Sequence, residues 1–274
     1  MDKLQASRCQ KRCPGSRYLA AILCLITFSA DLYAVTLSQA EALRIGKRIW
    51  QNECNGTVSG LTSWNAGENF ASLGIGHFIW YPKGVNGPFE ESFPRLLAFV
   101  AARGAKMPGI LLGGGDLDCP WSSRSEFVRA QQTSEMKQLR QFLVDTIEFQ
   151  AQFLVDRLQR ALPKMLEETS AANRPKVQRR FEDLSKSAQG CYALIDYVNF
   201  KGEGVLHTER YHGQGWGLLQ VLETIDETSG DSLQAFAQSA ASVLKRRVRN
   251  APPARNESRW LPGWLRRVNS YSRG

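Results

Sequence analysis

Apolar and polar residues first fall into a helical pattern soon after residue 37. Apolar side chains within Leu43–Trp50 recur near the spacing of one helix face. Ser38 followed by Glu41 is the signature of a capping box, in which each side chain bonds the other residue's backbone N–H. Asn55–Gly56 favours the left-handed backbone that ends a helix. The pattern therefore predicts a helix that begins at Ser38 and places Glu53 in its last turn.

The rest of the chain alternates between helical patterns and loops rich in Gly and Asn. Residues 56–90 have the composition of loops and short strands. No internal repeat is visible, and the pattern predicts one α+β domain that is mainly α-helical. The further helices are expected at Phe93–Arg103, Ser125–Glu168 with an interruption near Pro163, 175–188, Cys191–Phe200, Trp216–Thr228, Asp231–Arg249 and near Trp264.

The first 34 residues have the pattern of a leader. Basic residues dominate up to residue 17, and the apolar run Tyr18–Ala30 follows. A membrane-spanning helix needs about 20 apolar residues, so this shorter run favours a signal peptide cleaved after Ala34. The domains predicted are thus residues 1–34 as signal peptide and 35–274 as the folded part, in the periplasm or secreted. The alternative is an inner-membrane anchor formed by residues 18–30.

The charge and the cysteines of residues 35–274 limit which binding partners, disulfides and metal sites are expected. Without residues 1–34 the chain keeps 30 Lys and Arg against 24 Asp and Glu, a net charge of +6. A positive surface suits an anionic polymer such as the bacterial cell wall, and an exported protein rarely meets nucleic acid. Charge alone favours the alternative, a basic surface that only keeps the protein in solution. Cys54, Cys119 and Cys191 remain, so at most one disulfide forms within the chain. The few scattered histidines do not predict a metal site.

The segment from Glu53 to His77 joins a carboxylate at a helix end to a turn-rich stretch containing Glu68 and Ser72. It resembles the active-site region of the phage-type lysozymes. In that family a catalytic Glu ends the first helix, and an Asp and a Thr follow in a small hairpin. Here Ser72-Leu-Gly-Ile-Gly-His77 stands where the family has Thr-Ile-Gly-x-Gly-His.

Two later segments extend the resemblance in the family's order. Ala193–Gly202 looks like the family's buried Ala-Leu-x-x-x-x-Phe-Asn-x-Gly helix, and Ala240–Arg255 resembles its Arg-rich segment ending in Asn and Pro-x-Arg. Residues 122–188 look like an enlargement of the region between them. The resemblance implies a lysozyme-like fold with a small hairpin near the active site and an added helical segment.

The resemblance also implies cleavage of the glycan strand of peptidoglycan without metal or cofactor. Glycoside hydrolysis needs a proton donor and a group that activates water on the opposite side. We expect Glu53 to be the general acid, kept protonated by apolar neighbours and the helix end, and Glu68 and Ser72 to position water. Glu68 follows Glu53 by fifteen residues, more than the family's Asp follows its Glu. His77 is expected to fasten the hairpin.

Aromatic and amide side chains suit sugar binding, because rings stack on pyranoses and amides bond hydroxyls. Trp64, Trp216 and Gln220 are the predicted substrate contacts, with packing of Trp216 in the core as the alternative. Other functions stay open: a non-catalytic peptidoglycan-binding protein of the envelope, a lytic transglycosylase that needs one acid, and a thiol enzyme using Cys54 and His77.

Overall fold

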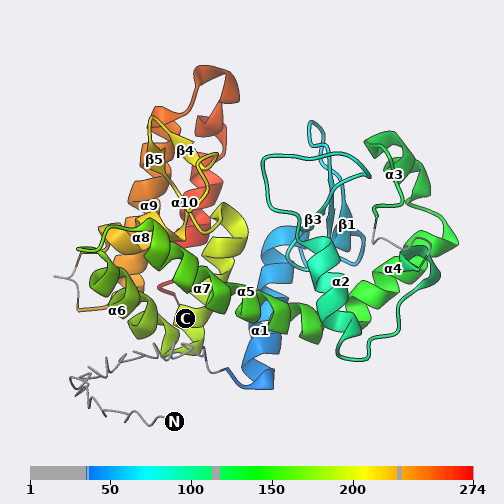
Figure 1. The fold of residues 1–274 in the computed structure, drawn as a ribbon, viewed down its shortest axis with the longest axis horizontal. Helices are drawn as coiled ribbons and strands as arrows, with labels where there is room; N and C mark the ends of the chain where they lie inside the picture. Colours follow the sequence, from blue (N-terminus) through cyan, green and yellow to red (C-terminus); the bar gives the residue numbers. More distant parts are fainter. Residues whose placement is uncertain (1–34, 36, 113–117, 227–229, 274) are drawn as a thin grey trace, which may run out of the picture. The chain divides into compact units, whose positions relative to one another are not determined.

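The computed structural model describes residues 35, 37–112, 118–226 and 230–273, which belong to one compact unit, Tyr33–Gly274. The predicted leader, and with it the alternative anchor at 18–30, lies outside these residues. The described helices confirm a mainly helical α+β protein (Figure 1). They are α1 Gln39–Cys54, α2 Phe93–Ala101, α3 Arg124–Ala130, α4 Ser134–Asp145, α5 Ile147–Glu168, α6 Arg174–Ser185, α7 Ala188–Lys201, α8 Leu218–Thr224, α9 Ser232–Asn250 and α10 Leu261–Asn269.

Helix α1 has the ends that its sequence predicts. Ser38 and Glu41 form the capping box, and Asn55 ends the helix in the left-handed conformation. The helix lies directly against α5, because a Cβ at Gly46 would stand only 2.7 Å from the Cβ of Ala151. The two helices thus approach at a glycine, which keeps the end of α1 in a defined place.

Two small antiparallel sheets complete the fold. The first pairs β1 (Thr62–Ser63), β2 (Ala71–Leu73) and β3 (Phe78–Trp80), with Ser72 opposite both Ser63 and Ile79. The second pairs β4 (Arg210–Tyr211) with β5 (Gln214–Gly215). In Figure 1, β1 and β3 lie near α2 on one side of α1, while α7–α10 lie on the other.

The turn between β2 and β3 is held from α5. The buried Gln150 side chain accepts a hydrogen bond from the Ile75 N–H at 2.9 Å and donates to the Leu143 carbonyl at 2.6 Å. Gly74 and His77 both have positive φ in this turn, 75° and 49°. A glycine is suited to that backbone, whereas His77 adopts it at some cost in free energy. Gln150 therefore helps to hold the turn that follows Ser72 and contains His77.

The prediction of a helix interrupted near Pro163 is wrong. The stretch breaks instead before Thr133 and at Thr146, and α5 continues through Pro163. A proline removes one backbone hydrogen bond from a helix. Here the neighbouring apolar side chains Leu162 and Met165 are buried in the core, and this packing holds the helix together across the proline.

The core runs through the whole described unit, from Ile49 of α1 to Tyr271 after α10. Among the described residues, no helix is both long enough and apolar enough to cross a membrane.

Candidate active site

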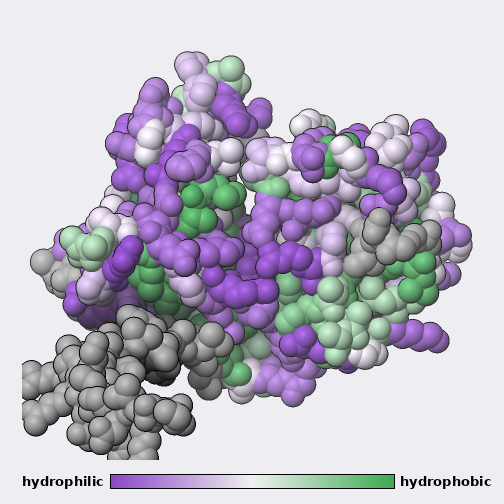
Figure 2. Space-filling model, in the orientation of Figure 1, coloured by the Kyte–Doolittle hydropathy of each residue, from purple (hydrophilic) through white to green (hydrophobic). Residues whose placement is uncertain are grey.

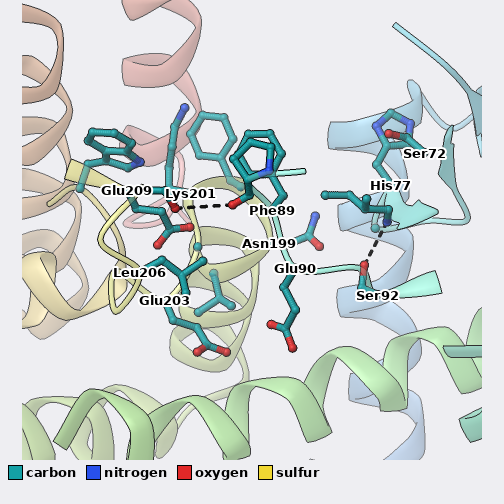
Figure 3. A pocket seen from close by; sticks show the side chains of 18 of the residues that line it. Ser72, His77, Phe89, Glu90, Ser92, Asn199, Lys201, Glu203, Leu206 and Glu209 are labelled. Atoms are coloured by element: carbon teal, nitrogen blue, oxygen red, sulfur yellow. Dashed lines mark hydrogen bonds between the residues drawn. The ribbon is translucent and has the colours of Figure 1, made fainter. Parts of the chain in front are cut away.

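A cleft of about 740 Å³ lies between the β1–β3 hairpin region and α7 with the segments that follow it. The surface is hollowed between these two groups of elements (Figure 2). Ser72 and His77 lie on one wall, and Asn199 and Lys201 of α7 lie on the other (Figure 3). Glu53, at the end of α1, also lines the cleft. The fold thus brings together residues from distant parts of the chain.

Glu53 is largely buried, with 16% of its side chain exposed. Its Oε1 accepts hydrogen bonds from Nη2 of Arg267 at 2.6 Å and from Nδ2 of Asn199 at 3.3 Å. Its Oε2 lies 3.8 Å from Nδ1 of His77. These neighbours are polar or charged, so the expectation of an apolar setting for Glu53 is wrong.

Arg267 is itself fixed by a second carboxylate. Asp196 has no exposed surface and accepts from Nε and Nη2 of Arg267, both at 2.8 Å. It also accepts from Asn52 at 3.0 Å and from the Tyr271 hydroxyl at 2.6 Å. Asp196 therefore balances the charge of the guanidinium, which bridges α1, α7 and α10 beside Glu53.

The ring of His77 connects the hairpin to the cleft. Its Nε2 lies 3.2 Å from the Gly60 carbonyl oxygen. A carbonyl oxygen only accepts, so Nε2 carries a hydrogen. In the neutral ring, Nδ1 then presents a lone pair toward Glu53. The bond to Gly60 agrees with the expected role of His77 in fastening the hairpin.

The two predicted partners of Glu53 also line the cleft. Ser72 is buried in β2, and its hydroxyl has no hydrogen-bond partner among the described residues. Glu68 lies in the loop between β1 and β2, where Asn65 donates to its Oε2 at 3.1 Å. Burial raises the pKa of Glu68, although the Asn65 bond and nearby His77 oppose this. Both side chains are thus placed to contact water or substrate.

Of the three predicted sugar contacts, one lines the cleft and two do not. Trp216 lines the cleft, although only 7% of it is exposed. Trp64 does not: it packs against Phe127 in the core and donates its indole N–H to the Glu68 carbonyl at 2.8 Å. Gln220 does not either: its buried amide accepts from Gly217 N–H and donates to the Gly204 carbonyl. Trp64 and Gln220 shape the loops that border the cleft and do not line it.

The ring of Trp216 belongs to a charged aromatic cluster. The Arg247 guanidinium lies 4.1 Å from it and donates twice to Glu257 at 2.8 Å. Tyr211 donates to Glu257 as well, at 2.9 Å. Burial would raise the pKa of Glu257, but the Arg247 hydrogen bonds outweigh it and hold the pKa below its usual value.

Cys54 is not placed as a nucleophile. It is buried, and its thiol lies 3.6 Å from the Gly74 carbonyl. Burial raises its pKa to about 12, with nearby Glu53 adding to the shift. A nucleophilic cysteine needs the opposite shift. All three cysteines of the described residues are free, and no group of three potential metal ligands gathers there.

The sequence reading missed Arg267, Asp196, Asn199 and Lys201 as residues of the site or its support. One signal was available: Asp196 stands inside an apolar helical run, and a charge there needs a buried partner. The partner itself lies 71 residues away and cannot be read from the sequence.

Comparisons of the chain with protein-family models, with curated proteins and with solved structures found no match.

Proposed function

We propose that this chain is a lysozyme-like hydrolase that cuts the glycan strand of peptidoglycan, with Glu53 as general acid. The observation that carries the proposal is the position of Glu53. It ends α1 in a cleft that also contains Ser72, His77 and Glu68 of the hairpin region. The resemblance of the sequence supports the same arrangement independently.

Activation of the attacking water is assigned to two residues of the hairpin region. An unbonded Ser72 hydroxyl in the cleft can hold the attacking water, and the ionised Glu68 can take its proton. A raised pKa makes a carboxylate a better base near neutral pH. The two acids then act as the donor and acceptor of an inverting pair.

Glu53 must carry a proton when the leaving oxygen departs. Arg267 beside it already has a fully buried counter-ion, because the guanidinium donates two hydrogen bonds to Asp196. Once the proton has left, Arg267 and Asn199 stabilise the resulting carboxylate.

The glycan chain would lie along the cleft with Trp216 as a ring-stacking wall. A protein that acts on peptidoglycan must be exported, and the signal peptide predicted at residues 1–34 would provide this. No cofactor is part of this mechanism.

The test is digestion of purified peptidoglycan with mass analysis of the released fragments. Wild type, Glu53→Gln and Glu68→Gln are compared with Glu167→Gln, an exposed glutamate of α5. We expect reducing-end muropeptides from wild type and Glu167→Gln. Loss of one positioned acid or base typically costs a hundredfold to ten-thousandfold, so both cleft variants fall by about that factor.

Other outcomes would replace the proposal. Anhydro ends, with Glu53 needed and Glu68 dispensable, would identify a lytic transglycosylase. Binding of the wall without release of fragments would identify a non-catalytic binding protein. Unchanged activity in Glu53→Gln would refute the assignment of the acid.

A further inference from the structure

Lys201 is the last residue of α7 and lines the cleft near Glu53, yet only 8% of it is exposed. Its ammonium nitrogen lies 3.4 Å from the ring centre of Trp264 and 3.9 Å from that of Phe200. Figure 3 shows its side chain on the α7 wall, across the cleft from Ser72. A lysine is almost never buried in this way without a partner.

Lys201 has no hydrogen-bonding or ion-pair partner within the part of the chain that the structure describes. An ammonium has three N–H donors, and none of those of Lys201 has a hydrogen-bond or ion-pair partner among the described residues. The carboxylate of Glu257 nearby is already bonded to Arg247 and Tyr211. Contacts with two aromatic rings offset only part of the cost of burying the ammonium, because a ring does not satisfy N–H donors as an oxygen atom does.

The charged groups around Lys201 can sum to a net positive charge, which one bound anion would neutralise. Arg247, Arg267, Glu53 and Glu257 act on Lys201 electrostatically, and Arg267 is also paired with Asp196. When Glu53 carries the proton that catalysis needs, three cations face two carboxylates. The cations are Lys201, Arg247 and Arg267, and the carboxylates are Asp196 and Glu257.

We propose that Lys201 binds a carboxylate of the ligand in this cleft, so that the site selects an acidic sugar over a neutral one. The inference rests on the proposed function and specifies its substrate. In peptidoglycan the carboxylate has two sources: the lactyl ether of muramic acid and the attached stem peptide. Burial and the neighbouring arginine Arg247 lower the pKa of Lys201 well below its usual value, and a bound carboxylate would reverse that shift.

The experiment measures binding of three probes to the full chain by titration calorimetry or NMR. N-acetylglucosamine is neutral, N-acetylmuramic acid adds the lactyl carboxylate, and muramoyl dipeptide carries its carboxylates on the peptide only. Wild type is compared with Lys201→Met, Lys201→Arg and Lys47→Met, an exposed lysine of α1.

Wild type and Lys47→Met should prefer an acidic probe over the neutral sugar by about tenfold or more, the usual effect of a charged hydrogen bond. Lys201→Met should remove this preference, and Lys201→Arg should keep part of it. A preference for N-acetylmuramic acid assigns the carboxylate to the sugar; a preference confined to the dipeptide assigns it to the peptide.

Two results would overturn the inference: a wild type without any preference, or an unchanged preference in Lys201→Met. A purely structural Lys201 would lower the melting temperature of Lys201→Met. A ligand-binding Lys201 leaves it equal or higher, since methionine packs well on aromatic rings and needs no counter-ion. These binding results are independent of cleavage, so failure of the hydrolase assignment would be seen separately in the Glu53→Gln digestion.

Discussion

Replacing Asp196 by asparagine tests the buried ion-pair network that holds Arg267 beside Glu53. The substitution keeps the volume of the side chain but replaces one oxygen by an NH₂ group. Each oxygen of Asp196 accepts two hydrogen bonds, so on either side the new NH₂ meets two donors. The Tyr271 hydroxyl can turn to accept, but the guanidinium has no acceptor. At least one N–H of Arg267 therefore loses its partner, together with the counter-charge.

The expected loss of stability follows from burial. Breaking a buried ion pair by removing one partner costs about 3–5 kcal/mol. Arg267 keeps its bond to Glu53 and 14% of its side chain is exposed, which favours the lower end, about 3 kcal/mol. For a unit of this length that corresponds to about 6–12 °C in melting temperature.

Thermal and urea unfolding followed by circular dichroism provide the measurement. The matched control is Asp156→Asn, whose ion pair with Arg160 on α5 is solvent-exposed on both sides, with 37% and 46% of the side chains accessible. An exposed pair contributes about 0–1 kcal/mol, so this variant should unfold almost like wild type. A loss below 1 kcal/mol in Asp196→Asn, or equal losses in the two variants, would refute the reasoning.

Two further predictions concern titration and reactivity. Because Arg247 holds the pKa of Glu257 below the ordinary 4.5, this carboxylate stabilises the fold above that value, and the contribution disappears as the pH falls through its lowered pKa. Glu257→Gln should therefore be less stable than wild type at pH 7 and approach it once the pH lies below that lowered pKa. Parallel melts over a series of acidic pH values that showed a constant difference would contradict the sign. Burial raises the pKa of Cys54 to about 12, so iodoacetamide at pH 8 should label it only after unfolding, and site-resolved mass spectrometry that found rapid labelling in the native protein would contradict its buried position.

Much of the local structure could be predicted from neighbouring residues alone. The capping box of Ser38 and Glu41 and the left-handed Asn55 involve contacts within a few residues, so the ends of α1 follow from the sequence. The mainly helical α+β class is also a matter of local periodicity. Pro163 shows the limit of this reasoning, because burial of its neighbours outweighs the intrinsic preference of proline.

For the site as well, some residues could be predicted from the sequence and others could not. The sequence pointed to Glu53, Glu68, Ser72 and Trp216, and all four line one cleft. It also pointed to Trp64 and Gln220, which the structure uses to hold loops. An aromatic or amide side chain looks the same in sequence whether it faces a cleft or the core.

Only the tertiary structure decided what surrounds Glu53. Arg267 lies 214 residues away in the sequence, and Lys201 reaches the cleft through the packing of α7 against α10 and its neighbours. Contacts at such separations depend on how helices pack, which local periodicity does not encode. The sequence alone therefore predicted the ends of α1 and the position of Glu53 in its last turn. The packed fold determined the charged partners of Glu53 and the buried lysine beside it.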